Sequence, residues 1–190
     1  MPWEVVAMAF ISYPETDISD PDSAPGFELL RDRHKGEAPN FLRIHGHHPE
    51  AGSLHCRLYS AIVDGPSELT PLQRVMIGVV VSQINDSHYW LQHLGAFLHG
   101  FGADENLIAR LQSDFRGADL PPADREMLEY VAKLTRLPRS VTEGDVETLR
   151  RQGFSDGAIH DICLTTAYFA LANRIASGLG VELERSVPRK

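Results

Sequence analysis

The sequence predicts an all-α protein: a helical domain over residues 27–184, an extended N-terminal arm over 1–26 and a C-terminal tail over 185–190. Apolar residues recur at helical spacing through most of the domain, a pattern that favours helices over strands. Proline and N-capping residues stand at the beginnings of these segments. The arm is instead rich in proline and acidic residues, which favours extended backbone. Its first residues alternate enough to allow one short strand.

The first predicted helices are short. A helix over 27–35 ends at Gly36, and a second begins after Pro39. A third begins at Pro49, because proline is favoured in the first turn of a helix, and it ends near Asp64.

The next two helices are predicted more sharply. Thr70 caps a helix that begins at Pro71, and the apolar run over 75–81 covers nearly every side of it. A helix that is apolar all round belongs at the centre of a fold. Asn85 and Asp86 end it, and Ser87 opens a helix that closes near Gly100.

Four helices complete the prediction of eight or nine. A surface helix covers 104–114, and Pro121-Pro122 begins the next one. Thr142 caps a helix over 143–152 through a variant of the capping box. Ser155 caps the last helix, which is expected to end at Gly178 or Gly180.

Composition limits the function more than it defines it. A hydrophobic content of 43% and a charged content of 23% are ordinary for a globular domain. The net charge of −8 argues against nucleic acid and against an anionic membrane surface as partners. No stretch is apolar for long enough to span a membrane, and the N-terminus lacks the features of a signal peptide. We therefore expect a cytoplasmic protein.

The sequence predicts neither a metal nor a cofactor. Cys56 and Cys163 lie far apart and form neither a CxxC motif nor a zinc spacing, so buried free thiols are the simplest interpretation. His45, His47 and His48 form a histidine cluster, but Gly46 and Pro49 interrupt the helix that would align their side chains. We interpret these histidines as loop residues.

Two long segments resemble one protein family. These are LTPLQRVMIGVVVSQINDSHYWLQHLGAFL over 69–98 and, more loosely, the sequence over 124–184. They are similar to the AhpD-like alkylhydroperoxidases and carboxymuconolactone decarboxylases, above all to the peroxidase-related branch. The resemblance covers about residues 10–184. It implies an all-helical AhpD-like domain, an antioxidant oxidoreductase activity of the peroxidase type and assembly into at least a homodimer.

The resemblance also implies where a reactive centre would lie. Redox-active members begin a helix with Cys-x-x-Cys, where the helix dipole lowers the pKa of a thiol. Here Ser87 matches the first cysteine and Trp90 the second. The relay glutamate matches Val75, and the usual histidine pair matches His93-Leu94. The catalytic histidine of the family is usually the second of the pair, so His93 is a retained position only if the proton relay uses the first. The resemblance therefore predicts that the thiol redox centre is lost.

The candidate site residues remain open to simpler interpretations. Ser87 is either an activated nucleophile with His88 or His93 as its base, or simply the N-cap of the helix. Asp86 is the one acid nearby, but it is next to Ser87 rather than behind His93, and we interpret it as sharing the capping role or as the cap itself. Trp90 is interpreted as a core or pocket-wall residue.

Three functions fit this sequence. The first is a peroxidase-related protein whose redox centre has degenerated and whose ligand is a small molecule or a peroxide. The second is a non-redox, decarboxylase-like enzyme in the same pocket, with His93, His88 and Arg74 as the candidate proton donors and anion anchors. The third is a non-catalytic, homo-oligomeric binding module.

Overall fold

A computed structural model describes residues 9–14 and 38–184 of the chain. Within them lie eight α-helices and no strand, which confirms the all-α prediction. The predicted helix over 27–35, most of the predicted arm and the tail lie outside the described residues. No helix in the described part combines the length and the hydropathy needed to cross a lipid bilayer.

The helices follow one another with short connections. Their bounds are α2 Asn40–Arg43, α3 Pro49–Tyr59, α4 Pro71–Ile84, α5 His88–Gly100, α6 Glu105–Ser113, α7 Pro122–Arg136, α8 Glu143–Arg151 and α9 Asp156–Leu179. A 3-10 turn, Ile44–His47, joins α2 to α3, and a π-helical turn, Ser60–Asp64, extends α3. Two further 3-10 turns, Phe115–Gly117 and Pro138–Ser140, follow α6 and α7.

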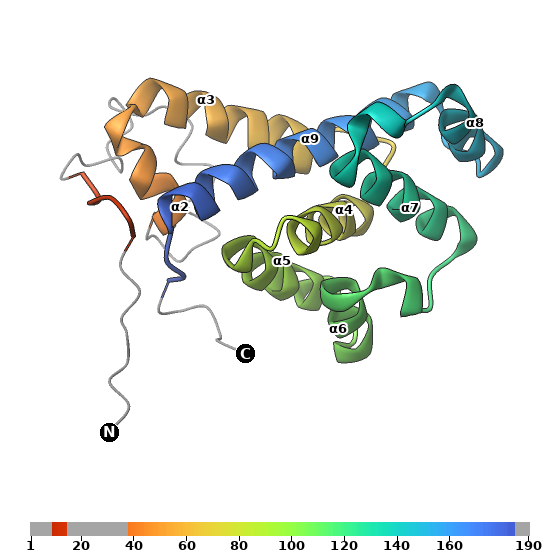
Figure 1. The fold of residues 1–190 in the computed structure, drawn as a ribbon, viewed down its shortest axis with the longest axis horizontal. Coiled ribbons are helices and arrows are strands. Elements are labelled where there is room, and N and C mark those ends of the chain that lie inside the picture. Colours follow the sequence, from red (N-terminus) through yellow and green to blue (C-terminus); the bar gives the residue numbers. More distant parts are fainter. Residues whose placement is uncertain (1–8, 15–37, 185–190) are drawn as a thin grey trace.

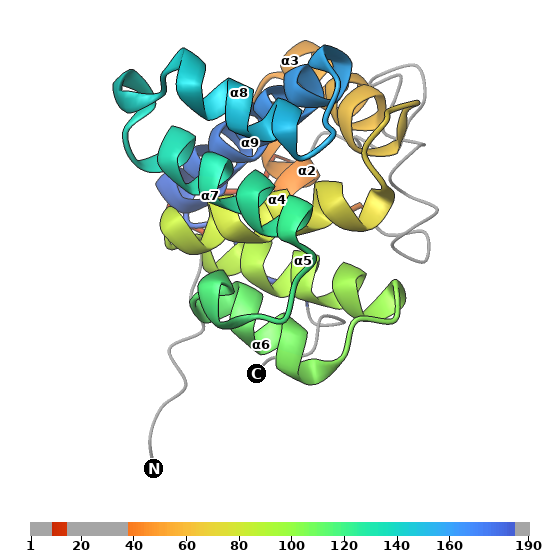
Figure 2. The same ribbon diagram turned by 90° about the vertical axis from the view of Figure 1, so that its right-hand side faces the viewer.

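Helix α4 lies at the centre of the fold, as its apolar sequence predicts. It packs against α5, α6, α7 and α9, and Figures 1 and 2 show these helices on different sides of it. Every residue from 74 to 82 is buried. The packing against α9 is close: a Cβ built on Gly78 would lie 2.7 Å from the Phe169 ring. Glycine therefore lets the two helices approach each other.

The predicted capping residues fix where α4 and α9 begin. The backbone N–H of Gln73 donates to the Thr70 hydroxyl, and the Thr70 N–H donates to the Gln73 side chain. This reciprocal pair satisfies two N–H groups that a helix start would otherwise leave open. The Ser155 hydroxyl accepts from the Ala158 N–H in the same way at α9.

The C-terminal segment returns across the starts of α2 and α5. The Phe10 N–H donates to the Leu179 carbonyl, and the Glu182 carbonyl accepts from the Asn40 side chain. Residues 181–184 therefore lie beside α2 (Figure 1).

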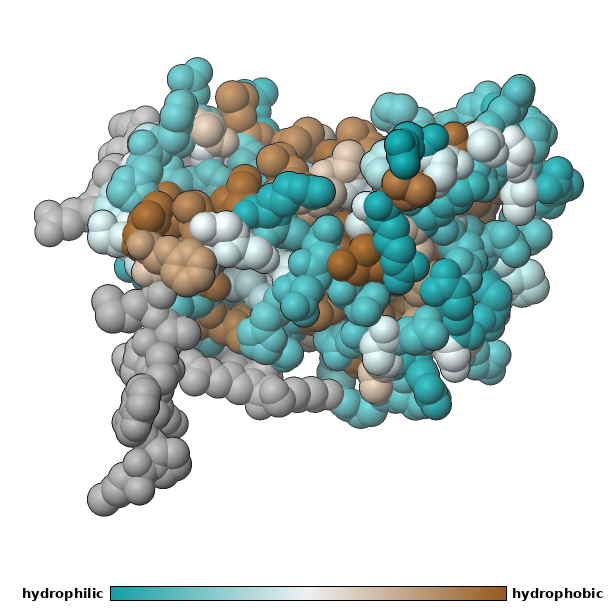
Figure 3. All heavy atoms as spheres, in the orientation of Figure 1, coloured by the Kyte–Doolittle hydropathy of each residue, from teal (hydrophilic) through white to brown (hydrophobic). Residues whose placement is uncertain are grey.

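One face of the molecule carries exposed leucines. Leu54 and Leu58 lie on α3, and Leu171 lies on α9. Figure 3 shows apolar side chains gathered over these two helices.

Candidate functional site

Ser87 stands at the predicted N-cap position of α5, but its side chain forms no cap hydrogen bond. At Thr70, Asp104 and Ser155, which do cap their helices, ψ is between 154° and 167°. At Ser87 ψ is 91°. The side chain is fully buried, and its Oγ has no hydrogen-bond partner among the residues that the structure describes. The prediction was right about the position and wrong about the bond.

Trp90, one turn later, is a pocket-wall residue, as predicted. Its ring packs edge-on against Phe41 of α2 and Phe169 of α9, with centroid separations of 5.1 and 5.7 Å. A large ring therefore fills the region where α2, α5 and α9 meet.

His93 is oriented by an acid that sequence reasoning missed. Its Nε2 lies 2.7 Å from Oε2 of Glu184, in the C-terminal segment. The other carboxylate oxygen of Glu184 accepts from the Asn40 N–H at 2.6 Å and from the Tyr89 hydroxyl at 2.9 Å. Asp86, the one acid near Ser87 in the sequence, is exposed and has a φ of 52°.

The surroundings of Glu184 keep its carboxylate charged. Burial acts to raise its pKa, but the hydrogen bond and the charge of His93 oppose burial, with help from backbone N–H groups. The result is a pKa lowered to about 2, so Glu184 is an anion at neutral pH. It balances the charge of His93 whenever that ring is protonated.

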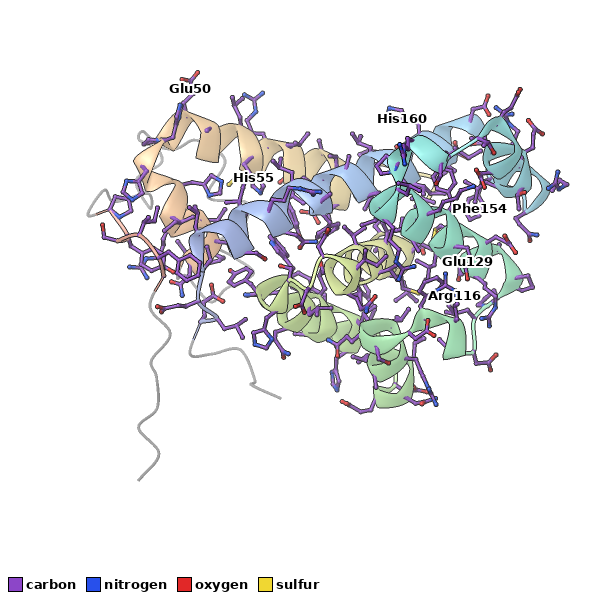
Figure 4. The ribbon with its side chains drawn as sticks, viewed as in Figure 1. Glu50, His55, Arg116, Glu129, Phe154 and His160 are labelled. Atoms are coloured by element: carbon purple, nitrogen blue, oxygen red, sulfur yellow. The ribbon has the colours of Figure 1, made fainter. Side chains whose placement is uncertain are left out.

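A second histidine faces the same pocket from α3. His55 Nε2 lies 2.8 Å from the hydroxyl of Tyr168 on α9, and Figure 4 shows His55 between these two helices. Burial, with a smaller effect of the charge on His45, lowers the pKa of His55 to about 4. Burial raises the pKa of Tyr168 well above its usual range. At neutral pH both groups are therefore uncharged.

These groups enclose one aromatic pocket. Its walls include Phe41, His55, Tyr89, Trp90, His93 and Tyr168. The cavity has a volume of about 30 Å³, which is room for about two water molecules. Among the described residues, no lysine, arginine, aspartate or glutamate lines it.

Three candidates from the sequence, Ser87, His88 and Arg74, do not line this pocket. His88 is exposed at the surface of α5. Arg74 is buried, and its Nη1 donates to the carbonyls of Ile62 and Gly65 at the end of the π-helical turn. Arg74 therefore fixes the connection between α3 and α4, and neither residue reaches a ligand in the pocket.

The histidine cluster is held by local contacts. The ring of His45 donates to the Phe41 carbonyl, and the ring of His48 accepts from the Ala51 N–H. His47 contacts the carbonyl of Ser12. Within the described part of the chain, no three histidine, cysteine or acidic side chains gather as metal ligands would.

Comparison with solved structures gives close matches over nearly the whole chain. An uncharacterized peroxidase-related protein from Silicibacter sp. TM1040 is 32% identical, with a TM-score of 0.86 over 94% of this chain and 93% of that one. The chain belongs to the peroxidase-related, AhpD-like family. A second peroxidase-related protein with the AhpD core, from Ralstonia eutropha JMP134, is 27% identical, with a TM-score of 0.84 over 93% of both chains.

A more distant match has a similar fold and is named for a different reaction. The debrominase Bmp8, bound to 2,3,4-tribromopyrrole, is 18% identical, with a TM-score of 0.79 over 94% of this chain and 95% of that one. At this identity the match shows the shared fold alone. No family sequence model and no curated protein sequence matched the chain.

In this AhpD-like protein the two thiols lie on α3 and α9. Cys56 is fully buried on α3, and burial raises the pKa of its thiol to about 12. Cys163 is half-buried on α9, with its Sγ 3.0 Å from the hydroxyl of Tyr130 on α7. Val75, which the resemblance matched to the family's relay glutamate, is buried in the core.

Proposed function

We propose that this chain is a peroxidase-related, AhpD-like protein in which the thiol redox centre has been lost. The observation that supports this most directly is the start of α5, where a fully buried Ser87 precedes a packed Trp90. A cysteine thiol can ionise near pH 7 and can be oxidised to a disulfide and reduced again. A serine hydroxyl does neither. An indole ring cannot act as a resolving group.

Neither remaining cysteine is a good replacement. A thiol with a pKa of about 12 contains almost no thiolate at pH 7, so Cys56 is a poor nucleophile. The Sγ of Cys163 contacts a tyrosine hydroxyl rather than a second sulfur. Both cysteines are free thiols, so they do not form a disulfide with each other in this structure.

A non-redox role for the same pocket has its own support. Two histidines, each held by a partner from a distant segment, face one cavity: His93 with Glu184, and His55 with Tyr168. Such pairs orient proton donors and acceptors. A decarboxylase-like reaction on a carboxylate substrate is less well supported, because neither Arg74 nor His88 lines the pocket and the carboxylate of Glu184 lies 2.7 Å from His93 Nε2.

Assembly into a homo-oligomer is part of the proposal. The exposed leucines Leu54, Leu58 and Leu171 supply an apolar surface over α3 and α9 that a second copy of the chain would cover. The molar mass in solution, measured by light scattering after size exclusion, tests this part. A monomeric mass at micromolar concentration would refute it.

The lost redox centre is tested by peroxide consumption. Purified protein is given hydrogen peroxide or an alkyl hydroperoxide, with dithiothreitol or a lipoyl donor as reductant. We expect no turnover above the rate without protein, and the same rate for the Cys56→Ser and Cys163→Ser variants. Rapid turnover that either substitution abolishes would identify a relocated thiol site and overturn the proposal.

A further inference from the structure

The aromatic pocket contains two histidines but offers a ligand no uncompensated positive charge. His55 is uncharged at neutral pH because burial lowers its pKa to about 4. His93, whenever it is protonated, faces the carboxylate of Glu184 at 2.7 Å. Among the described residues that line the cavity there is no lysine or arginine. A carboxylate or phosphate entering this pocket would lose its hydration without meeting an uncompensated cation, which is costly.

The tautomer of His55 follows from its contact with Tyr168. The Tyr168 phenol keeps its proton, because burial raises its pKa, and His55 Nε2 is its one hydrogen-bond partner in the described part of the chain. The hydroxyl therefore donates to Nε2, and the neutral ring carries its own proton on Nδ1. This leaves His55 with an N–H donor that no described residue accepts from.

Trp90 supplies a second donor of the same kind. Its indole lines the pocket and is 7% exposed, and its Nε1 has no hydrogen-bond partner among the described residues. The rings of Trp90 and His55 both pack on Phe41, with centroid separations of 5.1 and 5.0 Å. A buried N–H without an acceptor costs free energy that an acceptor on a ligand would recover.

We propose that this pocket binds a small uncharged molecule through a hydrogen-bond acceptor, such as an amide or ketone oxygen, held by the N–H groups of Trp90 and His55. The proposal rests on the proposed function, since it takes this pocket as the functional site. A neutral imidazole N–H is suited to polarising a carbonyl, because it donates without bringing a charge. The cavity of about 30 Å³ has room for about two water molecules, so a larger ligand must also move the aromatic side chains that form its walls.

The test compares two probes of the same shape and different charge. Acetamide is neutral with a carbonyl acceptor, and acetate is its anionic counterpart. The full-length protein is labelled with nitrogen-15 at pH 7.5, and each probe is titrated to about 100 mM at constant ionic strength, because ligands of this size bind weakly. The sequence contains two tryptophans, so the indole N–H signal of Trp90 is the one that the Trp90→Phe variant loses.

We expect acetamide to shift the Trp90 indole signal along a saturable curve, and acetate to bind at least tenfold more weakly. Trp90→Phe keeps an aromatic ring but removes the N–H, and should weaken acetamide binding about fivefold, followed through the backbone signals of Tyr89 and His93. His55→Phe removes the second donor and should have a similar effect. Its circular dichroism spectrum must match that of the wild type, and His55→Gln, which keeps an N–H donor, should lose less affinity.

Equal affinity for acetate and acetamide would overturn the proposal. So would a Trp90 signal that neither probe moves, or acetamide binding that survives both substitutions unchanged. These outcomes are independent of the peroxide assay. A protein that consumes peroxide through Cys163 would refute the lost redox centre and leave the preference for neutral ligands to be decided by the titration.

Discussion

His93 Nε2 lies 2.7 Å from Glu184 Oε2, and this contact joins helix α5 to the C-terminal segment of the chain. Glu184 also accepts from the backbone of Asn40 and the hydroxyl of Tyr89, so one carboxylate ties together α2, α5 and the residues after α9. A wall of the pocket therefore depends on a residue that lies far from it in sequence.

The first prediction concerns this carboxylate. Glu184→Gln keeps the shape of the side chain but removes its charge, and should lower the free energy of unfolding by about 1–3 kcal/mol at pH 7. The pKa of Glu184 is lowered from 4.5 to about 2, so its stabilising contribution is present above pH 4.5 and lost as the pH falls toward 2. Urea denaturation should therefore show a smaller difference between variant and wild type at pH 3.5 than at pH 7.

Glu50 offers a matched control for that measurement. It is exposed on the first turn of α3, where Figure 4 shows its side chain directed away from the ribbon. Glu50→Gln should change the unfolding free energy by less than about 1 kcal/mol, the usual effect of a charge near a helix N-terminus. If both variants behave alike, the contacts of Glu184 contribute no more than an ordinary surface charge.

The second prediction follows from the lowered pKa of His55. Its pKa falls from 6.5 to about 4 on folding, so the unfolded chain binds a proton more readily between these values. Protonation should therefore cost the wild type up to about 3 kcal/mol of stability as the pH falls from 7 to 4. His55→Gln lacks this group, while His45 and Tyr168 remain beside the site in both proteins. Unfolding curves measured across this range should fall less steeply for the variant; parallel curves would contradict the assignment.

The third prediction concerns the close packing of α4 on α9. A Cβ at Gly78 would lie 2.7 and 2.8 Å from two atoms of the Phe169 ring, so Gly78→Ala should destabilise the protein by about 1–3 kcal/mol despite the better helix propensity of alanine. Gly100→Ala is the control, since nothing lies within 4 Å of its Cβ. Thermal unfolding should separate the two variants. Adding Phe169→Leu to Gly78→Ala should recover part of the loss if the clash is its cause.

The fourth prediction concerns the thiols. Cys56 is fully buried with a pKa raised to about 12, so it should not react with a thiol reagent such as 5,5′-dithiobis(2-nitrobenzoate) until the protein unfolds. Cys163 is half-buried and should account for all labelling of the folded protein. The Cys163→Ser variant should then show no fast labelling at pH 8 and one reactive thiol in denaturant. Rapid labelling of the folded variant would show that α3 opens readily.

The central helices could be predicted from the sequence because their signals are local. Thr70, Pro71 and the apolar run after them define α4 without reference to any other segment, and the prediction was confirmed. The turn after α3 was missed: the apolar pattern continues through Ser60–Asp64, but the backbone there is π-helical. A change in hydrogen-bond register leaves no mark in the spacing of apolar residues.

The pocket could be predicted only in part, for the same reason. The resemblance grouped Ser87, Trp90 and His93 as positions of one motif; Trp90 and His93 line the pocket, and Ser87 does not. Glu184 and Tyr168 lie on other segments, and no sequence spacing links them to their histidines. Packing alone brings these residues together, so the sequence offered no acid positioned behind His93.

The π-helical turn at Ser60–Asp64 sets a limit on how this protein can be re-engineered. Arg74, buried beneath that turn, binds the carbonyls of Ile62 and Gly65, which stand where they do because the segment is wound more widely than an α-helix. Shortening the turn by a single residue would restore ordinary winding and rotate both carbonyls away from the guanidinium. The stretch between α3 and α4 should therefore reject deletions that a loop of similar length would accept.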